Sequence, residues 1–160
     1  DGYRMHITGL THDLRGYPVM DTATQEQMVT RLISKIRDNA DKIASYDTHY
    51  MDDAELVVVA YGISARPARQ AAYEARELGL KVGLIKLNTV WPFPEQMFRD
   101  LASSVKGMIM PEINMGQMVL ELERSVRGQC PVTLVSHPGG GIIRQNVILE
   151  TIESVLKERS

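Results

Sequence analysis

The stretch Glu55–Leu87, ELVVVAYGISARPARQAAYEARELGLKVGLIKL, decides the fold class of this 160-residue chain. It opens with ELVVVA (55–60), a short run of β-branched and apolar residues that is typical of a strand buried on both faces of a sheet. Alanines then recur at the spacing of one helix face, and Gly79 follows where helices commonly end. The run KVGLIKL (81–87) completes a strand–helix–strand unit, which predicts parallel pairing through a right-handed crossover.

The same alternation continues to the end of the chain. Two further strands are predicted at GMIMPE (107–112) and PVTLVS (131–136), each followed by a helical pattern. This order predicts a three-layer α/β/α domain with a mainly parallel sheet of four strands. We assign residues 1–22, which glycine and proline interrupt, to an irregular lead-in segment. Residues 23–160 are assigned to the α/β domain, beginning with an amphipathic helix.

Composition excludes several classes of function. The net charge of −2 gives no electrostatic basis for binding nucleic acid, and no apolar run is long enough to span a membrane. The one cysteine, Cys130, excludes an internal disulfide and a cysteine-based metal or iron–sulfur framework, and it favours a reducing, cytoplasmic setting. No histidine spacing indicates a metal site. The chain starts at Asp1, and we interpret it as a piece of a larger enzyme.

Ligands and partners of such sheets bind at the carboxyl ends of the strands. After the first parallel strand come Gly62, Ser64 and Arg66. Ser64 could simply cap the following helix, or Ser64 and Arg66 could face a ligand or a neighbouring subunit. The glycine patterns GxGxxG and GxxxxGK[ST], which bind dinucleotides and phosphates, do not occur here.

The second strand is followed by Trp91-Pro92-Phe93-Pro94. Proline fixes its own backbone and restricts the residue before it, so this loop is stiff. Trp91 and Phe93 could cover the end of the sheet. Alternatively, the loop could be a docking surface for another chain, because tryptophan is a favoured interface anchor.

The third strand ends at Glu112, and Asn114 and Gln117 follow it. Asn114 with Gln117 three residues later fits a helix-capping box. Glu112 needs more explanation, because a carboxylate at the end of a buried strand requires a hydrogen-bonding partner. We predict that charge-assisted hydrogen bonds hold Glu112, donated by a backbone N–H, by Arg66 or by a neighbouring subunit.

The fourth strand is followed by Gly139, Gly140 and Gly141 ahead of a helix. Bare backbone N–H groups there could bind an anion, or the glycines could form a tight turn. No serine or cysteine nucleophile accompanies His137, and no nucleophile, base and orienting group occur together. We therefore predict no catalytic residue and no metal ligand in this chain.

Taken in order, several motifs resemble the alpha subunit of 2-oxoacid:ferredoxin oxidoreductases. The resemblance extends from about residue 3 to 158, and two of its segments are fairly specific: Trp-Pro-Phe-Pro and Glu-x-Asn-x-Gly-Gln. The matching segments are TGLTHD (8–13), GYP (16–18), AYG (60–62), RPA (66–68), LNTVWPFP (87–94) and PEINMGQ (111–117).

The resemblance implies a domain similar to the carboxyl-terminal domain of transketolase. That fold implies a short antiparallel edge strand near 47–51. It also implies adjacent first and third parallel strands at the sheet centre. Residues 62–64 and 112–117 would then line one crevice.

The family decarboxylates a 2-oxoacid oxidatively with coenzyme A and passes electrons through iron–sulfur clusters to ferredoxin. Thiamine diphosphate, Mg and the clusters are implied for other domains or subunits, and no cofactor is expected in this one. The implied partners are the other domain of the same subunit, the thiamine-diphosphate-binding beta subunit and, through the complex, ferredoxin. The implied role is assembly and active-site access.

Two other interpretations come from different classes. One is a free-standing flavodoxin-like binding or signalling module, although the strand ends offer no aspartate that a phospho-receiver would need. The other is a nicotinamide dehydrogenase, which the missing glycine fingerprint disfavours.

Overall fold

The computed structural model describes residues 2, 4 and 6–158. The chain divides between Ile43 and Ala44 into two compact units, which are described separately.

The first unit holds the lead-in segment and two helices. Its loop is closed by a bridge between His12 and Pro18. Helix α1 (Thr22–Arg37) begins after Asp21, whose carboxylate accepts a 2.8 Å hydrogen bond from the backbone N–H of Thr24. The short helix α2 (Ala40–Ile43) completes the unit.

The predicted domain boundary after residue 22 stays a prediction, and the division between the two compact units lies after Ile43. Helix α1 groups with the lead-in segment, because none of its residues, all of which the structure describes, is buried in a core. Its apolar residues alone suggested membership of the α/β domain, but periodicity does not reveal which surface a helix packs on.

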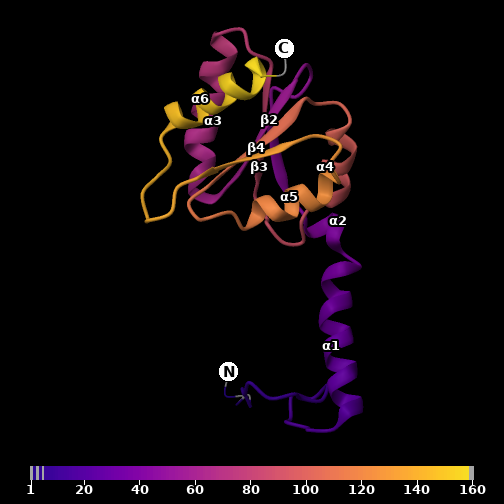
Figure 1. Ribbon diagram of the computed structural model, residues 1–160. Coiled ribbons are helices and arrows are strands. Elements are labelled where there is room, and N and C mark those ends of the chain that lie inside the picture. Colours follow the sequence, from indigo (N-terminus) through magenta and orange to yellow (C-terminus); the bar gives the residue numbers. More distant parts are fainter. Residues whose placement is uncertain (1, 3, 5, 159–160) are drawn as a thin grey trace. The chain divides into compact units, whose positions relative to one another are not determined.

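The second unit is built on a five-stranded sheet in the order β1-β3-β2-β4-β5 (Figure 1). Strand β1 pairs antiparallel with β3, and the other neighbours are parallel. The mainly parallel fold, the antiparallel edge strand and the central placement of the first and third parallel strands are confirmed. The strands are β1 (Tyr46–His49), β2 (Leu56–Tyr61), β3 (Val82–Leu87), β4 (Gly107–Glu112) and β5 (Val132–Ser136).

Helices cover both faces of the sheet, forming three layers (Figure 1). Successive side chains of β2 point to opposite faces of the sheet and so enter two different cores. On one face Val58 packs with α3 (Ala65–Glu77) and α6 (Gln145–Lys157). On the other face Val57 packs with α4 (Glu95–Ala102) and α5 (Met118–Val126). A single 3₁₀ turn, Gly62–Ser64, joins β2 to α3. The run ELVVVA is therefore apolar throughout because both of its faces enter a core.

The two central strands separate at their carboxyl ends. The register between β2 and β4 runs from Leu56↔Gly107 to Val58↔Ile109, although both strands continue for three more residues. On its other side β2 stays paired with β3 to the last residue, and β4 stays paired with β5. The sheet thus opens between β2 and β4, where the direction of winding reverses and ligands of such folds bind.

Candidate functional site

Three side chains of the protein occupy the opening between β2 and β4. The Tyr61 hydroxyl donates a hydrogen bond to Glu112 Oε2 at 3.2 Å and accepts one from Asn114 Nδ2 at 3.3 Å. Residues 51 and 53 positions apart in the sequence therefore meet at the predicted crevice. Tyr61 was missed as a site residue. Its signal was its place as the first polar residue after an all-apolar strand.

Glu112 is the anionic centre of this crevice. The residue is only 1% exposed, and its carboxylate accepts hydrogen bonds from the first amides of α5. Oε1 accepts from Val119 N at 2.6 Å, and Oε2 accepts from Gln117 N at 3.0 Å and Met118 N at 3.2 Å. A carboxylate is favoured at a helix N-terminus because it satisfies orphan amides and complements the helix dipole. The predicted hydrogen bonding of Glu112 by backbone N–H groups is confirmed.

The predicted capping box of Asn114 and Gln117 is wrong. Gln117 is the N-cap residue of α5 but makes no side-chain capping bond. Asn114 Oδ1 instead accepts from Gly116 N at 2.7 Å in a local turn. The reason is that the Glu112 carboxylate already occupies the amides that a capping box would satisfy.

At the end of β2, the predicted residues have different environments. Ser64 is buried and makes no capping hydrogen bond to α3, so its expected capping role is wrong and it does not face a surface partner. Arg66 is exposed, as a surface role would require. Gly62 adopts φ +53°, a left-handed conformation that favours glycine in this tight turn.

The two aromatic residues of the Trp91–Pro94 loop have different environments, and its role as a docking surface stays a prediction. Phe93 is 9% exposed and stacks on Phe98 with ring centroids 5.1 Å apart, so it belongs to the core. Trp91 is 67% exposed. The Trp91–Pro92 peptide is cis. Phe93 anchors the loop and leaves the indole at the surface.

Exposed apolar side chains gather at the carboxyl ends of three neighbouring strands. We call this set the carboxyl-edge patch. It contains Ile63 after β2, Val90 and Trp91 after β3, and Ile113 and Met115 after β4. Met115 is the most exposed of them at 75%. Exposed apolar side chains that follow neighbouring strands at one sheet edge are typical of protein–protein interaction sites.

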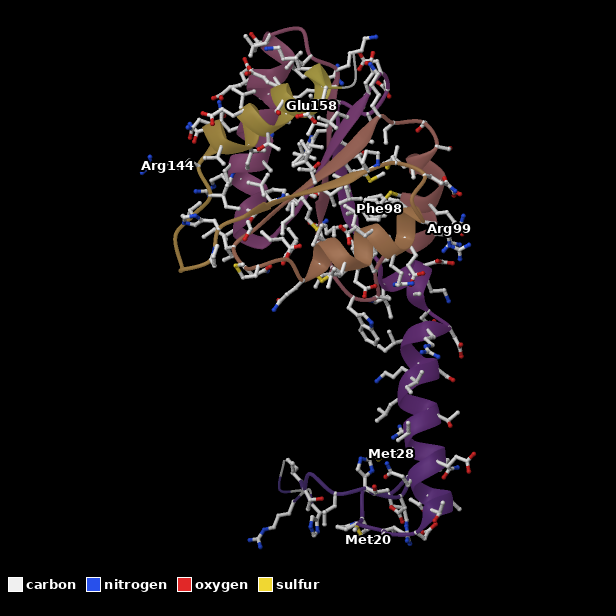
Figure 2. All side chains as sticks on the ribbon, in the orientation of Figure 1. Met20, Met28, Phe98, Arg99, Arg144 and Glu158 are labelled. Atoms are coloured by element: carbon white, nitrogen blue, oxygen red, sulfur yellow. The ribbon has the colours of Figure 1, made fainter. Side chains whose placement is uncertain are left out.

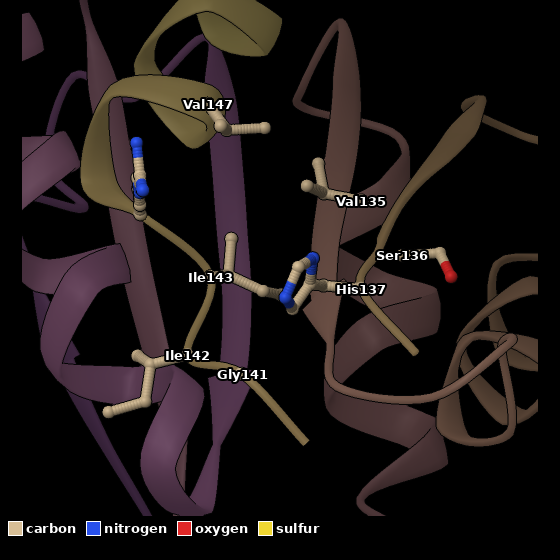
Figure 3. Close-up of a pocket in the computed structure, with 8 residues that line it drawn as sticks. Val135, Ser136, His137, Gly141, Ile142, Ile143 and Val147 are labelled. Carbon is tan, nitrogen blue, oxygen red and sulfur yellow. The ribbon is translucent and has the colours of Figure 1, made fainter. Parts of the chain in front are cut away.

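The glycine-rich corner after β5 borders a cavity of about 440 Å³ (Figure 3). His137 and Arg144 are its ionisable lining residues, and Gly141 lies against the His137 ring: a Cβ on Gly141 would come within 2.6 Å of Nε2. Gly139 and Gly140 adopt positive φ, as a tight turn requires. Anion binding by Gly139, Gly140 and Gly141 stays a prediction. The lining residues are Val135, Ser136, His137, Gly141, Ile142, Ile143, Arg144 and Val147.

The described part of the chain shows neither a metal-binding cluster nor a membrane-spanning helix. Among residues 2, 4 and 6–158, no group of three or more His, Cys, Asp or Glu side chains could hold a metal ion. Among the described helices, none has the length and apolar character to cross a bilayer. Cys130, the one cysteine of the sequence, is buried.

Comparison with known proteins identifies the family. Residues 54–148 match the family described as pyruvate:ferredoxin oxidoreductase core domain II. The 2-oxoglutarate synthase subunit KorA of Methanothermobacter marburgensis is 42% identical over 95% of this chain and 41% of its own length. The ketoisovalerate oxidoreductase subunit VorB of Methanothermobacter thermautotrophicus is 41% identical over 72% of this chain and 32% of its own. The chain thus spans well under half of these relatives.

Solved structures agree on the fold. A 2-oxoglutarate:ferredoxin oxidoreductase from Magnetococcus marinus, solved with 2-oxoglutarate, coenzyme A and succinyl-CoA bound, superposes with a TM-score of 0.74 at 20% identity, over 96% of this chain and 27% of that one. A split-gene transketolase gives 0.59 at 14% identity, over 69% of this chain and 41% of that one. The comparisons support the resemblance seen in the sequence and do not support a free-standing flavodoxin-like module. This chain belongs to the pyruvate:ferredoxin oxidoreductase core domain II family.

Proposed function

We propose that this chain is a domain of the alpha subunit of a thiamine-diphosphate-dependent 2-oxoacid:ferredoxin oxidoreductase, and that it serves assembly and active-site access. The observation that carries the proposal is the state of its carboxyl edge. The crevice where related folds take a ligand is filled by Tyr61, Glu112 and Asn114, and the surrounding surface is apolar and exposed. An edge of this kind is suited to contact protein.

The parent enzyme would convert a 2-oxoacid and coenzyme A to acyl-CoA and CO2, and pass two electrons through iron–sulfur clusters to ferredoxin. Thiamine diphosphate, Mg and the clusters would be held by other parts of the complex. The donor set supports this division: a cluster takes four thiolates, and this chain contributes one cysteine, which is buried. No step of the reaction is assigned to a residue of this chain.

The proposed partners are the other domain of the same subunit and the thiamine-diphosphate-binding beta subunit, with ferredoxin reached through the complex. The carboxyl-edge patch would contact the beta subunit, with Trp91 as an anchor in a loop that Phe93 fixes to the core. A reducing cytoplasm is the proposed location, because the one cysteine of the sequence provides no internal disulfide of the kind that secreted domains use.

The decisive experiment purifies the full-length parent with its partner subunits and assays 2-oxoacids for coenzyme A-dependent dye reduction. We expect turnover with one or more 2-oxoacids, and none from the pure 160-residue chain. Absence of turnover from the intact complex with pyruvate, 2-oxoglutarate, branched-chain and indole-type 2-oxoacids would overturn the proposal. Turnover by the chain alone would overturn its non-catalytic role.

The docking surface is tested by paired substitutions in the Trp91–Pro94 loop. Trp91→Ala should weaken subunit assembly by about 2 kcal/mol without lowering the stability of the chain. Phe93→Ala is the matched comparison, because it should destabilise the chain itself by about 3 kcal/mol. If Trp91→Ala changes neither assembly nor stability, the loop only covers the sheet.

A further inference from the structure

We propose that Tyr61 is a positioning residue that fixes the 113–117 loop, and with it the Ile113 and Met115 side chains, for docking at the carboxyl edge. The inference rests on the proposed function, because the docking partner is the beta subunit named there. Neither the sequence motifs nor the comparisons assign a role to this hydroxyl.

The first argument is the gap that Tyr61 spans. The β2–β4 register ends at Val58↔Ile109, so no ladder positions remain to hold the last three residues of each strand together. The Tyr61 hydroxyl crosses this gap to Glu112 and Asn114. A single phenol group therefore links the two central strand ends where backbone pairing has stopped.

The second argument is that the link continues into the loop. Asn114, which donates to Tyr61, accepts from Gly116 N at 2.7 Å through its side chain and from Ser136 Oγ at 2.7 Å through its carbonyl oxygen. Leu134 of β5 packs so closely that a Cβ on Gly116 would come within 2.8 Å of it. The loop is thus tied to β2, β4 and β5 together, with Tyr61 as the tie to β2.

The third argument is what the loop carries. Ile113 and Met115 are among the exposed apolar residues of the carboxyl-edge patch. Holding such side chains in place before binding lowers the entropy that a partner must remove. The partner that fits is a protein surface with an apolar patch of its own, since the side chains that the patch exposes are apolar.

The chemistry of Tyr61 makes a clean test possible. Burial, and secondarily the negative charge of Glu112, raise the pKa of the Tyr61 hydroxyl, so it stays protonated and donates at neutral pH. Tyr61→Phe removes only this hydroxyl. The three amide hydrogen bonds to Glu112 remain, so helix α5 keeps its cap and the fold is expected to persist.

The first measurement is hydrogen–deuterium exchange on the full chain, resolved to single amides. In Tyr61→Phe the amide of Gly116 should exchange about tenfold faster, with the thermal transition lowered by no more than a few degrees. The matched control is Tyr73→Phe, which removes a hydroxyl from an exposed tyrosine on α3 and should change nothing. Unchanged exchange at Gly116, or equal acceleration throughout the sheet, would overturn the proposal.

The second measurement uses the parent enzyme with its separately purified beta subunit. Tyr61→Phe should weaken association about fivefold, and saturating beta subunit should restore kcat, whereas Tyr73→Phe should match wild type. Faster exchange with unchanged association would mean that the tie is structural only, and the docking role would be rejected. If the wild-type complex has no turnover, the proposed function is rejected. The hydrogen-exchange result for Tyr61 does not depend on that outcome.

Discussion

Two corners of the same sheet edge, β4–α5 and β5–α6, have the same local plan and opposite outcomes. In each, a parallel strand runs through a short loop to the N-terminus of a helix. At β4–α5 the chain supplies its own anion, the buried Glu112 carboxylate, to the first amides of the helix. At β5–α6 the N-cap residue, Arg144, makes no side-chain capping bond, and a cavity lined by His137 and Arg144 lies there.

The difference shows how the end of one strand determines what a corner can bind. A helix N-terminus attracts negative charge whether that charge comes from the protein or from a ligand. At the β4–α5 corner the Glu112 carboxylate occupies the helix amides that an outside anion would bind. The corner instead holds the loop that carries exposed apolar side chains. At the β5–α6 corner, Arg144 precedes α6 (Figure 2), and among the described residues no carboxylate lines the cavity that it shares with His137 (Figure 3). The predictions below test this contrast.

The largest effect is expected from Glu112→Gln. The amide keeps the shape but loses the charge, and its NH2 group would face donors, so we expect a loss of about 3 kcal/mol in the free energy of unfolding. Urea denaturation measures it, with the exposed Glu77→Gln of α3 as a control that should stay within about 0.5 kcal/mol. In the assembled enzyme, assembly or turnover should fall by more than about twofold. A stability loss below about 1 kcal/mol would mean that the β4–α5 corner does not depend on its internal anion.

A pair of glycine substitutions compares the packing of the two corners. Gly116 and Gly140 both have positive φ, but a Cβ at Gly116 would come within 2.8 Å of Leu134, and one at Gly140 would meet nothing within 4 Å. Gly116→Ala should therefore cost about 2 kcal/mol, and Gly140→Ala about 1 kcal/mol from backbone strain alone. Thermal denaturation of both variants measures the difference. Equal losses would show that the closed corner is no more tightly packed than the open one.

The open corner should respond to an added anion. Inorganic phosphate is expected to shift the NMR resonances of the His137 imidazole, and Arg144→Gln should weaken that response about tenfold, or about 1.4 kcal/mol. His49 of β1 serves as the internal control. If both histidines respond alike, the phosphate is an adventitious ion only, and the prediction for Gly139–Gly141 fails.

The smallest effect tests whether burial gives Glu112 its importance. Glu95 and Arg124 form a solvent-exposed pair, with Arg124 Nη1 donating to Glu95 Oε2 at 2.9 Å. The hydrogen bonds from Arg124 lower the pKa of Glu95, so the folded protein binds this proton less readily than the unfolded chain. Its stabilisation is present above the unfolded pKa of about 4.3 and is lost as pH falls through the lower, folded pKa.

Because solvent screens this pair, Glu95→Gln should cost only about 0.5 kcal/mol at pH 7. The difference from wild type should shrink as the pH falls below the unfolded pKa and disappear below the lower, folded pKa of Glu95. Urea denaturation over a series of pH values measures it. A loss at pH 7 as large as that of Glu112→Gln would remove the distinction between buried and exposed carboxylates.

The local pattern of apolar and polar residues was sufficient to predict the layered α/β fold. The run ELVVVA is apolar at every position because both of its faces are buried, and the alanines of α3 recur at helical spacing because one face packs on the sheet. The family motifs then placed the edge strand and the two central strands. Glu112 could be singled out because a carboxylate that ends a buried strand needs donors.

Long-range packing decided the rest. Asn114 and Gln117 fit a local capping pattern, yet the backbone N–H of Gln117 donates its hydrogen bond to the Glu112 carboxylate instead. Ser64 stands where a helix cap is expected, but its side chain is buried and makes no capping hydrogen bond.

Composition and periodicity by themselves determined that this protein is a mainly parallel α/β domain, because the spacing of neighbouring apolar residues distinguishes strands from helices. Only the tertiary structure decided what fills the edge of the sheet. Tyr61 and Glu112 lie 51 positions apart, and they meet because β2 and β4 are neighbours that separate just before their ends. Neither spacing nor propensity encodes such a meeting, because it depends on strand order and register across the whole domain.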